Sequence, residues 1–344
     1  MEYRIGSFNV QNWSLGSSKD FEVIANIIKR ENLDVVAFQE ILSEGAGLRR
    51  LLEQCVKYQL NNWEMCWGYP NEPSDYEKQQ EMIKKDRRRE GYAYIWNASK
   101  FKLAETSVLG KKRIFTPRIV NAEDGKDAPN LSRSFFARTP YYIRLHPCNG
   151  TFFELRLINI HIFHGNNNSL ANIAKRKEEF EKLVCEVLPA IDQRRFGNFR
   201  DTYTIAMGDY NLNILRPEYP SQDKNAFLHE IMVASEYGNA RIITVQDKLT
   251  SLKDPDNTEV VGTESKDIGK NNYDHFSYRA NAFANISWNV IEAVDKYCDG
   301  DLSVYRKTIS DHLPIMIKFD FSATPPILLT NALIEDHKDN DRSV

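Results

Sequence analysis

Ser310-Asp311-His312-Leu313-Pro314 places an acid beside an imidazole, directly before the apolar run Ile315-Met316-Ile317. This run alternates poorly with polar residues and is typical of a buried strand. Asp311 and His312 would therefore lie at the mouth of a strand, aimed in different directions. An isolated Asp-His pair more often belongs to a surface turn than to a site. Its meaning depends on whether other strands supply partners.

The composition is that of an ordinary globular protein. Of the 344 residues, 42% are hydrophobic and 27% are charged, and the length alone allows two domains. The net charge of −3 neither favours nor excludes nucleic-acid binding, so local charge clusters must decide. The five cysteines, without a Cys-x-x-Cys spacing, favour reduced thiols over a disulfide framework. The N-terminus resembles no signal peptide and no apolar run could span a bilayer, so we expect a cytoplasmic protein without a membrane partner.

The apolar patterns predict a mixed α/β protein. Strands are expected over residues 3–10, 33–38, 92–96, 101–109, 135–145, 152–162, 203–207 and 273–278, with 101–109 as a hairpin partner of 92–96. Helices are expected over 19–32, 48–58 and 170–193, near 225–235, and over 287–297. The polar segments 76–89, 118–133 and 248–272 are typical of loops or solvated surface.

Polar side chains lie at one end of most of the predicted strands. They are Asn9, Glu40, His161, Asp209, Asn211, Asp274 and the Asp311-His312 pair. Each has an ordinary explanation: an acid at a helix start for Glu40, a structural histidine for His161, a turn for Asp209. Because α/β proteins build their sites at strand ends, so many strands that end in this way favour one shared site.

Taken in order, these segments resemble the motifs of the endonuclease/exonuclease/phosphatase superfamily, the deoxyribonuclease I-like fold. The matches are Phe8-Asn9-Val10-Gln11-Asn12, Gln39-Glu40, Asn159-Ile160-His161, Gly208-Asp209-Tyr210-Asn211, Tyr273-Asp274 and Ser310-Asp311-His312-Leu313-Pro314. One such segment is a weak match, whereas the ordered set is specific. The resemblance implies a single α/β domain over residues 1–323, a four-layer sandwich of two packed, mostly antiparallel sheets flanked by helices. Residues 324–344 would form a flexible tail.

Two further segments are similar to the deoxyribonuclease I branch. Phe136-Ala137-Arg138-Thr139-Pro140 implies that Arg138 faces the scissile phosphate, and Glu90-Gly91-Tyr92 implies that Glu90 orients His161. The chain departs from that branch where a phosphate-contacting tyrosine would fall near Arg88, and where a histidine of unassigned role follows Asp274. His161 argues against the abasic-site branch. The residues after Asp209 lack the tryptophan-rich pattern of the inositol-polyphosphate 5-phosphatases.

The resemblance also implies catalytic roles. Asp274 would stabilise His312 as general base, and Glu90 would support His161 as leaving-group acid or phosphate stabiliser, although which histidine is the base stays open. Asp209 would position the water or bind a second metal. Asn211 would orient the phosphate or the nucleophile, since residues two apart on an extended segment face the same side.

A hard divalent cation is the implied cofactor. Glu40 would bind it through oxygen, with help from Asn9 and Asp311; Mg²⁺ is expected, and Mn²⁺ suits the same ligands. A zinc site at His161 and His164 is disfavoured because no cysteine or third histidine lies near in sequence.

The basic run before Glu90 favours a polyanionic substrate. If Glu90 lies at the site, this run would bind substrate at its rim, together with Arg138 and Asn211. The run comprises Lys84, Lys85, Arg87, Arg88 and Arg89. We therefore expect a Mg²⁺-dependent hydrolase, a nuclease with DNA favoured over RNA and an endonuclease first. The alternatives are a small-molecule or lipid phosphodiesterase or phosphatase on the same scaffold, and a catalytically inert phosphate-binding member.

Overall fold

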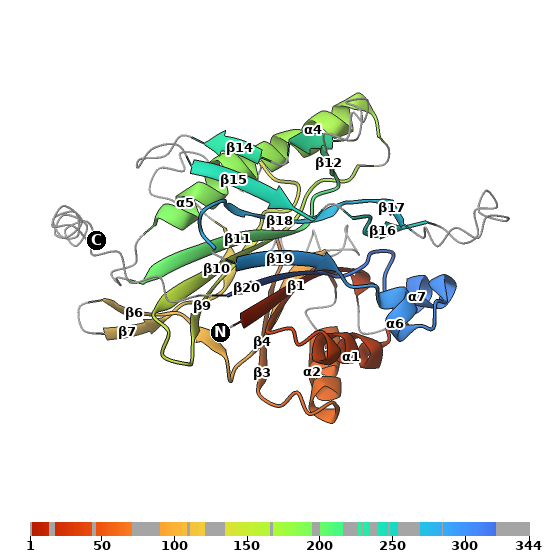
Figure 1. Ribbon diagram of the computed structural model, residues 1–344, viewed down its shortest axis with the longest axis horizontal. Helices are drawn as coiled ribbons and strands as arrows, with labels where there is room; N and C mark the ends of the chain where they lie inside the picture. The colour runs from red at the N-terminus through yellow and green to blue at the C-terminus, as the bar shows by residue number, and fades with distance from the viewer. Residues whose placement is uncertain are drawn as a thin grey trace, which may run out of the picture.

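Two β-sheets packed face to face form the centre of the molecule (Figure 1). The computed structural model describes residues 2–13, 18–42, 46–70, 90–108, 111–120, 135–165, 168–194, 200–215, 226–228, 230–233, 240–246, 248–253, 269–283 and 285–320. The predicted tail 324–344 and the basic run 84–89 lie outside these residues. None of the helices in the described part has the length and apolarity that a bilayer crossing requires.

The first sheet has the strand order β19-β20-β1-β2-β4-β3 within the described residues. Its strands are β1 (Glu2–Trp13), β2 (Val35–Ile41), β3 (Trp63–Gly68), β4 (Gly91–Asn97), β19 (Asn285–Val290) and β20 (Ile315–Asp320). Only β1 and β2 run parallel; the other pairs are antiparallel. Four helices lie on the outer side of this sheet in Figure 1: α1 (Phe21–Arg30), α2 (Ala46–Lys57), α6 (Ala293–Tyr297) and α7 (Leu302–Thr308).

The second sheet has the order β14-β15-β18-β11-β10-β9-β5, with β8 paired to β9. Its strands are β5 (Phe101–Leu103), β8 (Arg118–Ile119), β9 (Tyr141–Pro147), β10 (Phe153–His161), β11 (Asp201–Asp209), β14 (Glu230–Val233), β15 (Ala240–Val245) and β18 (Asp274–Arg279). Its outer face carries α4 (Leu170–Lys182), the π-helical turn Leu183–Val187 and α5 (Leu188–Gln193). These three segments together cover the predicted helix 170–193.

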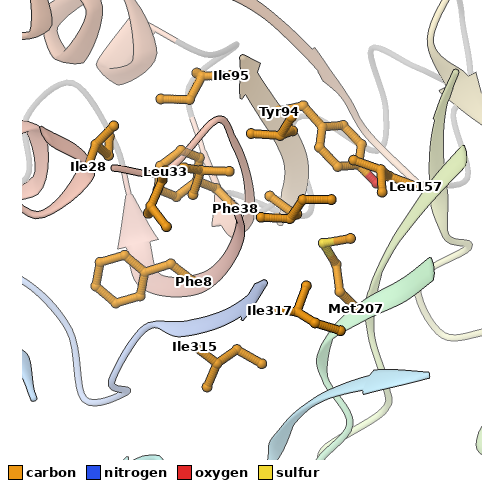
Figure 2. Packing of buried hydrophobic residues seen from close by; sticks show 14 of the residues in the cluster. Phe8, Ile28, Leu33, Phe38, Tyr94, Ile95, Leu157, Met207, Ile315 and Ile317 are labelled. Atoms are coloured by element: carbon orange, nitrogen blue, oxygen red, sulfur yellow. The ribbon is translucent and has the colours of Figure 1, made fainter. Parts of the chain in front are cut away.

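The four layers follow from where apolar side chains gather. One buried cluster fills the space between the sheets, where Ile317 of the first sheet lies beside Met207 of the second (Figure 2). The same cluster extends to the helix side of the first sheet, where Phe38 packs with Phe8. Another cluster joins the second sheet to α4 and α5, with Ile158 against Phe180 among its members. Since each sheet is covered on both faces, the residues of its central strands are near-continuously buried. The predicted α/β sandwich of two mostly antiparallel sheets is confirmed.

Several element predictions are wrong. The expected helix near 225–235 is replaced by β13 (Ala226–Leu228) and β14, where exposed Glu230 and Met232 alternate with more covered Ile231 and Val233, a strand period. The expected helix 287–297 is strand β19 up to Val290 and helix only from Ala293.

Two strand predictions need correction as well. The described part of the predicted strand 101–109, residues 101–108, does not pair with β4, because the turn after Asn97 takes the chain to the other sheet, where β5 pairs with β9. The strand expected from residue 135 begins only at Tyr141, after Pro140. A proline cannot donate a hydrogen bond to the ladder, which fits a strand that starts behind it.

Three small pairings complete the described chain. They are β6 (Glu105–Val108) with β7 (Lys111–Ile114), β12 (Asn213–Leu215) with β13, and β16 (Ser251–Leu252) with β17 (Gly269–Asn271). The last pair lies in the segment 248–272 that was expected to be a loop. Ser251 also forms an isolated bridge with His312, so this segment reaches the strand mouth singled out by the sequence.

Candidate active site

The site is organised around the end of β11. Asp209 is the register partner of His161 on parallel β10 and of Asp274 on antiparallel β18. Residues in register on neighbouring strands point to the same face, so the three side chains form a row. All three are buried.

Asn9 links this row to the first sheet. Its Nδ2 donates to Asp209 Oδ2 and to Glu40 Oε1, each at 3.0 Å. Glu40 also accepts a hydrogen bond from the backbone of Asn12, at 2.8 Å. Glu40 has a φ of 61°, a left-handed conformation that is uncommon for a glutamate and is found preferentially at functional sites. The amide thus joins two carboxylates from opposite sheets.

Asp274 and His312 form a close buried pair. His312 Nδ1 lies 2.7 Å from Asp274 Oδ2, and its Nε2 points toward Asp209 Oδ2 at 3.7 Å. Because a carboxylate only accepts, Nδ1 carries the proton of this bond. Burial lowers the pKa of His312, but the charges of Asp274 and Asp209 outweigh it and raise that pKa well above its usual value. Burial raises the pKa of Asp209 to about 7, an effect that Asp274 strengthens and His312 opposes.

Ser310 explains how the Asp-His segment is held against β1. Its hydroxyl donates to the backbone oxygen of Asn9 at 2.6 Å and accepts from the backbone N–H of His312 at 3.0 Å. On the other side, the Tyr305 hydroxyl donates to the backbone oxygen of His312 at 2.9 Å. The backbone of His312 is therefore fixed by two hydrogen bonds, both with hydroxyls of buried side chains.

His161 lies in a different electrostatic environment. Its Nδ1 is 3.5 Å from Glu90 Oε2, and Glu90 Oε2 is 2.5 Å from Arg138 Nε. Its Nε2 is 3.6 Å from Asp209 Oδ2. Burial lowers the pKa of His161 well below its usual value, and the nearby charges of Arg138 and His312 add to the shift. The site therefore holds one imidazole that favours the neutral form and one that favours the charged form.

Tyr92 connects the segments that carry His161 and Arg138. Its hydroxyl accepts from the backbone N–H of His161 at 3.0 Å and donates to the backbone oxygen of Arg138 at 3.2 Å. Tyr92 is fully buried in strand β4, so it is a structural link rather than a surface for stacking.

The turn after β11 has strict backbone requirements. Gly208 has a φ of 144°, and a Cβ there would lie 1.8 Å from the backbone oxygen of Ile160, so only glycine fits. Asn211 has a φ of 52°, which asparagine tolerates, and its N–H donates to Asp209 Oδ1 at 2.8 Å. This explains the Gly208-Asp209-Tyr210-Asn211 motif.

The donor set suits a hard cation. Among the described residues, potential ligand atoms of Asp209, Asp274 and His312 lie within 4.8 Å of one another. Asp274 Oδ1 is buried with no hydrogen-bond partner in that part of the chain. Glu40 adds a carboxylate on the far side of Asn9. Clustered carboxylate oxygens are ligands that Mg²⁺ and Mn²⁺ accept.

Asp311 and Glu40 both lie close enough to Lys19 to affect it. Burial lowers the pKa of Lys19 to about 8, while the carboxylates of Asp311 and Glu40 oppose the shift. The ammonium donates to the backbone oxygen of Ile309 at 2.7 Å. The charges of both carboxylates predicted to bind metal therefore act on the same ammonium group.

Two further sequence predictions concern His275 and the basic run 84–89. His275 faces away from Asp274 and lies with its ring nitrogens 2.9 and 2.8 Å from the backbone oxygens of Gln246 and Leu212, a structural position. The described residues do not include the predicted substrate-binding run, which comprises Lys84, Lys85, Arg87, Arg88 and Arg89. Glu90, which follows it, does lie beside His161.

Sequence reasoning missed several residues that shape the site. His164 was weighed only as a zinc ligand, yet its Nδ1 lies 2.8 Å from Asn211 Oδ1. Arg176 and Glu179 are buried polar residues on the inner face of α4. Their signal was available, because they share that face with Ile173 and Phe180 at helical spacing.

No protein-family model and no curated protein sequence matches the chain. Among solved structures, an endonuclease/exonuclease/phosphatase family protein from Leptotrichia buccalis is 17% identical with a TM-score of 0.51, over 93% of this chain and 100% of that chain. A humanised TDP2 of D. rerio is 15% identical with a TM-score of 0.48, over 93% and 99%. A mannosyl-6-phosphatase from Bacteroides thetaiotaomicron is 14% identical with a TM-score of 0.47, over 93% and 100%. The chain therefore has the deoxyribonuclease I-like fold, which the ordered motifs of its sequence predict.

Proposed function

We propose that the chain is a metal-dependent phosphodiesterase that hydrolyses a nucleic-acid backbone, with DNA ahead of RNA. The observation that carries this proposal is the buried Asp274–His312 bond of 2.7 Å, which aims Nε2 at Asp209 beside the Asn9–Glu40 link. A protein that only binds phosphate needs no such acid–imidazole pair. This argues against the inert alternative.

Proton transfer would run through Asp209 and His312. Their facing atoms, Oδ2 and Nε2, lie 3.7 Å apart, and the two groups would share one proton between them. A water held at this pair would lose its proton to it as it attacks the phosphorus. Asp274 keeps His312 in the required tautomer, as in other acid–histidine pairs.

The opposite side of the row would hold the phosphate. His161 favours the neutral form and can donate one hydrogen bond to a phosphate oxygen, while Arg138, beside Glu90, supplies a fixed positive charge. Asn211, tied to Asp209 through its backbone, would orient the same phosphate. These contacts would stabilise the charge that grows on the phosphate oxygens in the transition state.

Glu40, Asp311 and Asn9 would hold a divalent cation, Mg²⁺ or Mn²⁺. When bound, such an ion offsets charge on the phosphate and polarises the leaving oxygen. Glu40 is already fixed by the Asn9 amide and the Asn12 backbone, so its carboxylate needs little reorganisation.

The choice of substrate rests on charge. The basic run that ends at residue 89 immediately precedes Glu90, which lies beside His161, so its cations would reach the rim of the site. A rim of this kind suits a polyanion, and a polynucleotide fits better than a lipid or a small phosphoester. The rivals remain a phosphodiesterase or phosphatase for small molecules or lipids.

A substrate panel with purified protein and Mg²⁺ or Mn²⁺ tests the proposal. It compares supercoiled, linear and single-stranded DNA, RNA, inositol phosphates and sphingomyelin for the wild type, His312→Ala and the control His146→Ala. His146 is another buried histidine beside a carboxylate, that of Glu154. Glu154 lies on β10 seven residues before His161, which is about 23 Å along the strand. We expect DNA cleavage by the wild type and the control, and a loss of several orders of magnitude for His312→Ala. Wild-type rates for His312→Ala, or turnover of inositol phosphates alone, would overturn the assignment.

A further inference from the structure

His164 is a third imidazole at the mouth of the site. It follows β10 by three residues and its side chain is exposed, in contrast to buried His161 and His312. Its Nδ1 lies 2.8 Å from Asn211 Oδ1. The mechanism described above gives it no role.

The hydrogen bonds of Asn211 settle which nitrogen of His164 donates to it. Asn211 Nδ2 donates to the backbone oxygen of Ile162 at 2.9 Å, and a carbonyl oxygen can only accept. The amide oxygen must therefore be the atom that faces His164. An amide oxygen also only accepts, so Nδ1 of His164 carries a proton, and Nε2 is the ring nitrogen that does not bond Asn211.

The backbone of this loop is anchored by α4. Buried Arg176 donates through Nε to the backbone oxygen of His164 at 2.9 Å. Buried Glu179 accepts from the backbone N–H groups of Phe163 at 3.0 Å and Ala137 at 2.8 Å. Ala137 and Phe163, which directly precede Arg138 and His164, thus both donate to the Glu179 carboxylate. The imidazole of His164 is held in place rather than carried by a freely moving loop.

We propose that His164 is a substrate-contacting residue whose Nε2 binds an oxygen of the phosphate held at Asp209 and Asn211. This inference rests on the proposed function, because it takes that phosphate from it. A phosphate oxygen beside Nε2 accepts a hydrogen bond, so the ring donates from both nitrogens, to Asn211 and to the phosphate. The class of ligand is a phosphoester whose charge is recognised from the β10–α4 side of the site.

Two variants separate this contact from a purely orienting role. His164→Asn places an amide near the position of Nδ1, so it keeps a donor for Asn211 but removes Nε2. His164→Gln carries its amide near the position of Nε2 and gives up the bond to Asn211. Steady-state kinetics with the DNA substrate and thermal melting of each variant are compared with the wild type.

For His164→Asn we expect an unchanged melting temperature, a KM raised about tenfold to a hundredfold, the worth of a charged hydrogen bond, and a kcat within a few-fold of wild type. His164→Gln should recover part of the KM. Wild-type kinetics for His164→Asn, with or without a defect in His164→Gln, would show that Nε2 touches no substrate.

Direct binding distinguishes this inference from the proposed function. A fluorescent phosphorothioate oligonucleotide, titrated by anisotropy, needs no turnover. If the wild type hydrolyses no phosphodiester, the proposed function fails. The His164 contact is tested separately, and equal Kd values for the wild type and His164→Asn would overturn it. A Kd at least about tenfold weaker for His164→Asn supports it.

Discussion

Asp274→Asn removes one charge from the centre of the site and leaves the shape of the side chain unchanged. Asp274 is fully buried at the start of β18, and His312 Nδ1 lies 2.7 Å from its Oδ2. The substituted amide has two orientations. With its oxygen toward His312, the NH₂ group occupies the place of Oδ1, where the described residues offer no hydrogen-bond partner. With its NH₂ toward His312, the proton of the ring moves to Nε2, and the atom that faces Asp209 can no longer accept one.

Either orientation has a large kinetic effect. A hydrogen bond to a charged group contributes about 1.5–3 kcal/mol to stabilisation, and 1.36 kcal/mol is a tenfold change in rate, so loss of the charge alone costs about one to two orders of magnitude. A wrong tautomer at an acid–histidine pair costs about 10⁴ in a serine protease. We therefore expect kcat to fall by about 10²- to 10⁴-fold, in line with these two effects.

The assay is the initial rate of DNA cleavage at saturating Mg²⁺, with thermal melting on the same samples. His146→Gln is the matched control, since it alters a buried acid–histidine contact of 3.1 Å at the far end of β10. It should leave kcat within a few-fold of wild type. A kcat for Asp274→Asn within tenfold of wild type, or a loss explained by unfolded protein, would refute the argument.

Three further outcomes are expected. Glu154 is buried and neutralises nearby arginines; burial raises its pKa, but the hydrogen bonds of His146 and Arg144 outweigh this, and the pKa is lowered. Because the folded pKa of Glu154 lies below the unfolded value of about 4.3, the stability of the wild type should fall as the pH drops below that value. Glu154→Gln should melt at a lower temperature at pH 7, and its melting temperature should depend less on acid pH. Melting temperatures of the two proteins that run parallel from pH 7 to 3 would contradict this. Gly208→Ala should yield little folded protein, because its Cβ would meet a backbone oxygen, whereas Gly150→Ala, with nothing within 4 Å, should fold; equal solubility and melting would count against the turn geometry. Neutral residues in place of the basic run 84–89 should weaken DNA binding and flatten its salt dependence, and an unchanged slope would remove that run from the substrate argument.

The fold was predictable where local pattern and tertiary burial agree. The run Val35–Phe38 is fully buried between a helix layer and the second sheet, so its unbroken apolar character marks a strand. Helix α1 carries its own start signal, since Asp20 accepts from the backbone N–H groups of Glu22 and Val23. Prediction failed at the sheet edges. Among the described strands, β14 pairs only with β15, and its alternation covers only four residues, too few to distinguish a strand from a helix by period.

The residues of the candidate site could be singled out from sequence, whereas their contacts could not. The motif order placed Asp209, Asp274 and His312 at strand ends, and the register of β10, β11 and β18 then sets them side by side. The amide of Asn9 bonds Asp209, a residue 200 positions away, which no local pattern encodes. His164 was hidden for another reason: its contact with Asn211 depends on the left-handed backbone of that residue.

The central claim is that the strand-end cluster is a metal-dependent phosphodiesterase centre. It is tested most directly by the rate of DNA hydrolysis before chelation with EDTA, after it, and after Mg²⁺ is restored, for the wild type and Glu40→Gln side by side. Because Glu40, Asp311 and Asn9 would hold the cation that the reaction needs, EDTA should abolish wild-type turnover and Mg²⁺ should restore it. Glu40→Gln should need a higher Mg²⁺ concentration for half its maximal rate. Hydrolysis that persists at the full rate in EDTA would contradict the account.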